Sequence, residues 1–522
     1  LGRGAYGIQA AAKAYYNKDV SQLTVSEGAL LAGVIQSPSR WDPAINPTKA
    51  RDRWNYVLDG MVAQGWLSRQ DRAETVFEDP VPPKTIGGGI PGDHLGHVYT
   101  QVKAELTGRL GISEQEINSE GLKITTTINE GLEKQAAQIS NKVLKSEPKN
   151  LRTALVAEDP TTGAIVAYFG GENGVGLDYA QVEKQPGSSF KPFVMAAALQ
   201  HSPPIGLGTE YEGKSPMTIK GQTVANSDGD SCDQCDLKEA MTKSINTVFY
   251  QVAVQVGPAA VAAAAHAAGI PPDLLPDPTA GIALGDKEVH PGDMASAYST
   301  FANNGQYLQP HMITRVETAD GRVLYNQDAP APDERFTAQI ARNVTESMLN
   351  VAQGSAIPLS GGRQVAAKTG TTQNRIEGQN NDAWTVGYVP TLTTAVWVGT
   401  DDNSPIKTSA GTPIYGRMVA GTIWQQFMNV ALRNTPAQRF PDFQPIGKAP
   451  SSDGDDDNSD DNSDDDGHHH HRHHHHGEDG QDPCDFVQCD DDGNPVAGDG
   501  SARDNNNNRD NNGNNNDDDD GN

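Results

Sequence analysis

Three Ser-x-x-Lys tetrads place a hydroxyl and an amine three residues apart, beginning at Ser146, Ser188 and Ser404. The first and last contain a proline and lie in polar sequence, whereas Ser188 follows a Pro-Gly turn and opens an apolar stretch typical of a helix. At a helix start Lys191 would share one face with Ser188. It could take the serine proton if burial or a nearby cation lowers its pKa. The tetrad thus predicts acyl transfer by Ser188; an ordinary helix start with a surface lysine is the alternative.

Ser-x-Asn occurs once, as Ser244-Ile245-Asn246, inside the predicted helical stretch 240–252. Ser and Asn are mildly disfavoured in the middle of a helix, so their presence suggests a function. The Ser244 hydroxyl could relay a proton, and the Asn246 amide could bind a peptide carbonyl. A solvent-facing side of the helix is the alternative.

Lys-Thr-Gly also occurs once, as Lys368-Thr369-Gly370, followed by Thr371. It ends a strand-like run over 364–368. A cation and a hydroxyl on a strand edge suit a substrate carboxylate, and Gly370 would let a substrate backbone approach as an added strand. The alternative is a strand-to-loop turn.

The order of the three motifs is more specific than any one of them, because penicillin-binding proteins and class A β-lactamases share this combination. Segments 185–192, 244–247 and 368–372 resemble the transpeptidase motifs of class A penicillin-binding proteins. The resemblance covers roughly residues 120–435 and includes four supporting segments, 159–163, 281–285, 294–298 and 382–384.

The resemblance implies that Ser188 is acylated, that Lys191 activates it and that Ser244 passes a proton to the leaving amine. Asn246 would hold the substrate and Lys191. The terminal carboxylate would contact the Lys368–Thr371 segment, and the oxyanion hole would use two backbone N–H groups, those of Ser188 and Thr371. The implied reaction is peptidoglycan D,D-transpeptidation, in which a D-Ala-D-Ala stem peptide is cross-linked to an acceptor amine and which β-lactams block by acylating the serine.

Three other functions remain open. A D,D-carboxypeptidase or β-lactamase would use water in place of the acceptor amine, and a penicillin-binding sensor would be acylated without turnover. In a third alternative the tail is the main feature, and the protein is a metal-binding surface polypeptide.

The first residues resemble the last motif of the peptidoglycan glycosyltransferase domain, which class A proteins carry ahead of the transpeptidase. The matching segments are 2–8, 26–27 and 30–32. The catalytic glutamates of that domain belong to earlier motifs, and the chain starts at Leu1 rather than Met. We therefore expect an incomplete N-terminus that lacks a membrane anchor, no glycan polymerisation by this sequence, and in Arg3 at most a leftover substrate contact. Lipid-linked precursor and cell-wall assembly proteins would be partners of the intact protein, on the extracytoplasmic face of a bacterial membrane.

The elements that must position these motifs read as α+β, with one antiparallel sheet covered by helices. Residues 1–68 are predicted to be helical, with a capping box from Thr24 to Glu27. Strands are predicted at 122–128, 154–157, 164–169, 364–368, 382–388 and 393–399, and helices at 188–200, 237–256, 258–268, 291–303 and 416–432. The predicted domains are 1–78 (glycosyltransferase remnant), 79–150 (linker and small connector), 151–435 (transpeptidase) and 448–522 (disordered acidic tail).

Charge separates the tail from the body. Residues 451–522 hold 23 Asp and Glu against three Arg, so the tail carries −20 of the net charge of −28. Such a segment cannot bury enough apolar surface to fold. The acidic balance excludes nucleic acid as a partner, and no run of eighteen apolar residues could span a membrane.

Four cysteines form two close pairs, Cys232/Cys235 and Cys484/Cys489. In an exported protein two local disulfides are favoured over metal ligands or free thiols. The histidine run at 468–476 is predicted to be a solvated spacer rather than a transition-metal site. We expect no metal and no cofactor.

Overall fold

The computed structural model describes residues 2, 3, 5, 7–82, 90–329 and 331–451. The helices predicted within residues 1–68 are present, a further one extends to Glu74, and they pack on their own core around Leu31, Trp54 and Leu58. The predicted capping box is confirmed, because the Thr24 hydroxyl accepts from Glu27 N and Thr24 N donates to the Glu27 carboxylate. The helices are α1 (Ile8–Tyr16), α2 (Val25–Val34), α3 (Pro38–Trp41), α4 (Pro47–Ala63) and α5 (Arg69–Glu74).

A five-stranded antiparallel sheet forms the centre of the second part of the chain, with the strand order β12-β13-β14-β2-β3. The predicted hairpin turn joins the first two strands: Asp159 accepts from Thr161 N at 2.9 Å, and Gly163 takes a left-handed φ of 74°. The strands are β2 (Leu151–Asp159), β3 (Ala164–Phe169), β12 (Ala366–Gln373), β13 (Asn380–Val389) and β14 (Leu392–Thr400).

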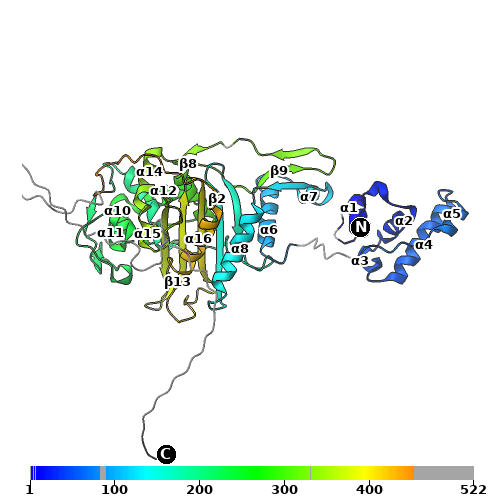
Figure 1. The fold of residues 1–522 in the computed structure, drawn as a ribbon, viewed down its shortest axis with the longest axis horizontal. Coiled ribbons are helices and arrows are strands. Elements are labelled where there is room, and N and C mark those ends of the chain that lie inside the picture. The colour runs from blue at the N-terminus through cyan, green and yellow to red at the C-terminus, as the bar shows by residue number, and fades with distance from the viewer. Residues whose placement is uncertain (1, 4, 6, 83–89, 330, 452–522) are drawn as a thin grey trace, which may run out of the picture. The chain divides into compact units, whose positions relative to one another are not determined.

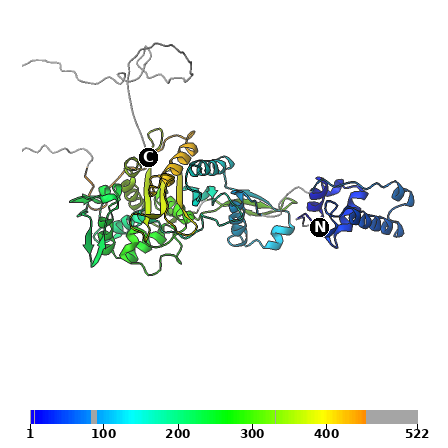
Figure 2. The ribbon, with the colours of Figure 1, turned by 90° about the horizontal axis from the view of Figure 1, so that it is seen from below.

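Both faces of this sheet are buried, because alternate side chains enter two separate cores. Val156, Trp384 and Trp397 face the first core, and Leu155 and Val396 face the second. Figure 1 shows α10, α11, α12 and α14 on one side of the strands and α8 on the other, and Figure 2 shows α16 beside α8 on the second face. These helices are α8 (Glu130–Leu144), α10 (Leu237–Thr242), α11 (Asn246–Val256), α12 (Pro258–Ala268), α14 (Ala338–Met348) and α16 (Val419–Ala431).

Helix α9 (Lys191–Gln200) lies inside the first core, and all of its residues from Lys191 to Leu199 are buried. Phe193 packs edge-on against Tyr298 of α13 (Pro291–Ala302), with ring centroids 6.0 Å apart. Because α9 is enclosed on all sides, any polar group at its start is removed from bulk water.

A small sheet joins two distant parts of the chain. Strand β1 (Lys123–Thr126) pairs with β9 (Ile313–Glu317), which pairs in turn with β10 (Val323–Asn326). In Figure 1 this hairpin reaches toward α7 (Glu114–Ser119), and α6 (Leu95–Thr107) packs on β3. The predicted 79–150 module therefore takes in strands from beyond residue 151, a long-range pairing that chain order does not reveal.

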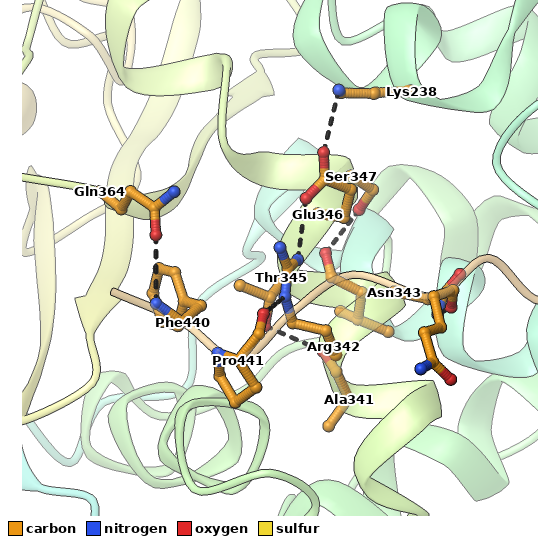
Figure 3. A network of polar contacts seen from close by, with 12 residues as sticks. Lys238, Ala341, Arg342, Asn343, Thr345, Glu346, Ser347, Gln364, Phe440 and Pro441 are labelled. Atoms are coloured by element: carbon orange, nitrogen blue, oxygen red, sulfur yellow. Dashed lines mark hydrogen bonds and ion pairs between the residues drawn. The ribbon is translucent and has the colours of Figure 1, made fainter. Parts of the chain in front are cut away.

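The segment after α16 is tied to the domain up to the last described residue. Figure 3 shows Arg342 directed at the Pro441 carbonyl and Gln364 accepting from Phe440 N. Ser451 donates to Asp236, the N-cap of α10, so residues 448–451, predicted to belong to the tail, are in contact with the domain. Among the described helices none is by itself long and apolar enough to cross a membrane; α11 and α12 meet the criteria only as a pair bent by 97°.

Candidate active site

Ser188 lies in a tight turn ahead of α9, the 3-10 helix η2 (Gly187–Phe190), rather than in the α-helix itself. Gly187 enters the turn with a left-handed φ of 57°, which glycine adopts without strain. Within the turn the Ser189 hydroxyl donates to Pro186 O at 2.7 Å, and Tyr298 donates to Ser189 O at 2.5 Å. The turn thus holds the Ser188 side chain at a fixed place.

Three of the supporting segments noted in the sequence contact this turn. Tyr298 belongs to 294–298. Trp384, in 382–384, donates to Gln185 O at 2.9 Å. A Cβ on Gly285, in 281–285, would lie 2.3 Å from Gly187 O, so only glycine fits there. Together they hold the backbone on both sides of Ser188.

Lys191 is the first residue of α9 and is fully buried. Its Nζ lies 2.5 Å from Ser188 Oγ, 2.8 Å from Asn246 Oδ1 and 3.3 Å from Ser244 Oγ. Burial, followed by the positive charge of Lys368, holds the pKa of Lys191 well below its usual value of 10.5. A neutral amine in contact with the Ser188 hydroxyl has the property that a general base requires.

The helix predicted over 237–256 is broken, and that part of the prediction is wrong. Ser244 lies between α10 and α11 with a left-handed φ of 59°, and Asn246 is the first residue of α11. The break directs the Ser244 hydroxyl at both lysines, and it lets Asn246 bond Lys191 and also donate to Ala225 O at 3.0 Å. The polar residues that looked out of place in a helix are therefore the residues of the break.

Lys368 lies inside strand β12, which runs to Gln373, five residues past the predicted strand end. It is fully buried, and its Nζ lies 2.9 Å from Ser244 Oγ and 3.0 Å from Thr369 O. Burial lowers the pKa of Lys368 to about 7. A substrate carboxylate would restore the charge on this amine.

β12 ends the sheet and pairs on one side with β13, so its other edge borders the Ser188 turn. Thr369 and Thr371 line the cleft in front of Ser188, and Thr371 Oγ1 accepts from Gly416 N at 3.0 Å. Gly370 faces the turn: a Cβ there would lie 2.2 Å from Pro186 O. The sequence predicted that Gly370 lets a substrate backbone approach closely. The structure gives a second reason for glycine at this position, because the turn before Ser188 occupies the space that a Cβ would need.

The cleft holds about 400 Å³ and has walls that the sequence did not indicate. One wall comes from the loop before α10, another follows α15 (Val351–Gly354), and a third precedes α16. The last was predicted as part of a helix from 416, but α16 begins at Val419 because Gly416 packs on β12. The lining residues that no motif marked include Ser227, Asp230, Ser355, Tyr415 and Arg417.

The remaining predicted residues lie elsewhere or outside the described chain. Cys232 and Cys235 form a disulfide, whereas Cys484, Cys489 and the histidine run are outside the described residues. Arg3 belongs to the N-terminal helical part, where its guanidinium pairs with Asp42 at 2.7 Å and donates to Val81 O. In the described ranges no group of three His, Cys, Asp or Glu is arranged to hold a metal ion.

Comparison with known proteins identifies two families along the chain. A family model for the penicillin-binding protein transpeptidase domain matches residues 153–418, and a transglycosylase model matches residues 1–62. Penicillin-binding protein 1A of Mycolicibacterium smegmatis is 43% identical over 473 residues, which is 86% of this chain and 59% of that protein. The protein of the same name from Mycobacterium tuberculosis is 43% identical over 467 residues, with coverages of 86% and 56%. The chain thus spans less than two thirds of the length of either relative.

Solved structures give the same result. PonA1 from Mycobacterium tuberculosis in complex with penicillin V matches with a TM-score of 0.65 and 39% identity, over 68% of this chain and 97% of that one. Penicillin-binding protein 1A from Haemophilus influenzae has a TM-score of 0.67 at 20% identity over 83% of this chain and 84% of that one, which supports the fold alone. The chain therefore belongs to the penicillin-binding proteins, with a transpeptidase domain preceded by a transglycosylase segment, the class A arrangement.

Proposed function

We propose that the chain is a serine D,D-transpeptidase that cross-links peptidoglycan stem peptides and is acylated by β-lactams. The observation that carries the proposal is the contact of 2.5 Å between the Lys191 amine and the Ser188 hydroxyl. The amine is fully buried and its pKa is lowered, and Ser188 lines an open cleft. A structure of the relative PonA1 contains penicillin V, which supports the same ligand class here.

In the first half-reaction Lys191 takes the proton of Ser188 as Oγ attacks the carbonyl carbon between the two D-alanines. The N–H groups of Ser188 and Thr371 would stabilise the oxyanion. The carbon–nitrogen bond then breaks, and the departing D-alanine amine takes a proton from Lys191 through Ser244, whose Oγ is 3.3 Å from the Lys191 amine. An ester to Ser188 remains.

In the second half-reaction an amine of another stem peptide attacks this ester. The Ser188 oxygen regains a proton along the same route, and a peptide cross-link forms. Lys368, Thr369 and Thr371 would hold the terminal carboxylate of the donor. In the intact protein we propose glycan polymerisation by the complete transglycosylase domain, lipid-linked precursor and assembly proteins as partners, and a location on the extracytoplasmic face of the membrane.

The test is acylation by a fluorescent penicillin, with mass mapping of the modified peptide. The label should fall on Ser188, and Ser188→Ala should lose it while the protein keeps its unfolding temperature. Labelling that persists in this variant rejects Ser188 as the nucleophile.

Incubation with donor and acceptor stem peptides then separates the alternatives. Cross-linked dimers indicate a transpeptidase, and hydrolysed donor alone indicates a carboxypeptidase. Release of bound penicillin within seconds indicates a β-lactamase, and stable acylation without any peptide product indicates a sensor. Full acylation after removal of residues 452–522 would exclude the tail as the main feature.

A further inference from the structure

Asn226 is a buried amide in the loop between β6 (Gln222–Val224) and α10, and its side-chain NH₂, its side-chain oxygen and its backbone N–H are all hydrogen-bonded. Its Nδ2 donates to Gly213 O at 3.0 Å and to Asp230 O at 2.8 Å. Its Oδ1 accepts from Thr247 N at 3.0 Å, and its own backbone N donates to Ser215 Oγ at 2.8 Å. The side chain thus ties its own loop, at Asp230, to two segments 13 and 21 positions away, at Gly213 and Thr247.

Each of these segments borders the catalytic cleft or supports it. Asp230 lines the cleft. Gly213 pairs through its backbone with Cys232, which the disulfide joins to Cys235 just before α10. Thr247 lies in the first turn of α11, directly after Asn246.

The neighbour of Asn226 completes the link to the site. Asn246 donates from Nδ2 to Ala225 O at 3.0 Å while its Oδ1 accepts from Lys191 at 2.8 Å. If the amide turned over, its oxygen would face the Ala225 carbonyl, and two acceptors would lie against each other. The position of Ala225 therefore selects the orientation in which Asn246 accepts from Lys191.

We propose that Asn226 is a positioning residue for acyl transfer: it fixes the Ala225 carbonyl and the first turn of α11, and through them the orientation of the Asn246 amide toward Lys191. The inference rests on the proposed function, because Asn246 and Lys191 act in that reaction. Asn226 itself contacts neither the nucleophile nor the base and is not a catalytic residue.

The test compares Asn226→Ala with Asn343→Ala in the full chain. Asn343 is equally suited to hold a segment, since it is buried, donates to Gln339 O and Gln444 O, and accepts from Ile446 N. It belongs to the network of Figure 3, around α14. Both variants lose buried hydrogen bonds, so both should unfold at lower temperature.

Only Asn226→Ala should lower the second-order rate constant of penicillin acylation, by about tenfold or more, as expected when a reacting group is misplaced. The acid limb of its rate–pH profile should also move to lower pH, because a protonated Lys191 loses the Asn246 acceptor. A purely structural loss would not move this limb.

An unchanged rate, or a limb that stays in place or moves to higher pH, overturns the proposal. Asn226→Ser, which keeps a small polar group, is measured in the same way if the alanine variant does not fold. Failure of the wild-type protein to be acylated would count against the proposed function, whereas equal acylation of wild type and variant would count against Asn226 alone.

Discussion

Lys191 and Lys368 share one hydroxyl: their Nζ atoms lie 3.3 and 2.9 Å from Ser244 Oγ, and neither side chain is exposed. When two buried amines lie this close together, it costs free energy for both to stay protonated. The pair therefore favours a state with one proton fewer, in which Lys191 is the neutral amine. Four predictions follow from this arrangement and from the packing around it.

Replacement of Lys368 by alanine should slow acylation. The expected loss is about 1.5–3 kcal/mol of transition-state stabilisation, the value of hydrogen bonds to a charged group. The measurement is the second-order rate constant with a fluorescent penicillin. Lys103→Ala, which removes an exposed lysine paired with Glu114, is the control and should keep the wild-type rate. An equal rate for Lys368→Ala would remove this residue from the site.

The same lysine should destabilise the fold. Its pKa is about 7 when folded, against an ordinary 10.5, so between these values the unfolded chain binds more protons and stability rises with pH. Lys368→Met keeps the length without the charge. Its unfolding free energy near pH 7 should exceed wild type by roughly 2–4 kcal/mol, and stability should rise less steeply with pH up to 10.5. Urea titrations at several pH values between about 7 and 10.5 measure the unfolding free energy of both proteins. If this free energy depends on pH in the same way in the variant and in wild type, burial does not lower the pKa of Lys368.

Ser244 should be strained as well as functional, because its φ of 59° is costly for any residue with a Cβ. Ser244→Gly and Ser244→Ala both remove the hydroxyl, and each should lose about 10²–10⁴-fold in acylation rate. The glycine variant should be the more stable of the two by about 1 kcal/mol, the relief of left-handed strain. Equal stability of the two variants in thermal unfolding would count against strain at this position.

Gly370→Ala should disturb the turn that holds Ser188, since the added methyl would lie 2.2 Å from Pro186 O. We expect both a loss of acylation and a fall in stability of about 1–3 kcal/mol, as for other overpacked sites. Gly60→Ala is the control, because no atom outside the neighbouring backbone of its own helix lies within 4 Å of the added methyl. If Gly370→Ala loses acylation but keeps the stability of wild type, glycine is needed here only so that a substrate backbone can approach closely.

The residue types and their order determined the chemistry of this protein. The Ser188 tetrad, Ser244-Ile245-Asn246 and Lys368-Thr369-Gly370 were identifiable because each needs only a short stretch of chain. Short apolar runs beside turn signals also located the sheet strands, and apolar stretches located most helices, because both are local patterns. That Leu155 and Val156 enter two different cores was decided by the tertiary structure. Composition separated the acidic tail for the same reason.

Tertiary structure decided everything that depends on residues distant in the sequence. The helix breaks at Ser244 because its hydroxyl accepts hydrogen bonds from two buried lysines. The sequence predicted an unbroken helix because it shows only the apolar residues on either side of Ser244. The lowered pKa of Lys191 requires enclosure of α9 and the nearness of Lys368, 177 positions away along the chain. Asn226 carries no motif of its own, because its role comes from three backbone partners that meet only after folding.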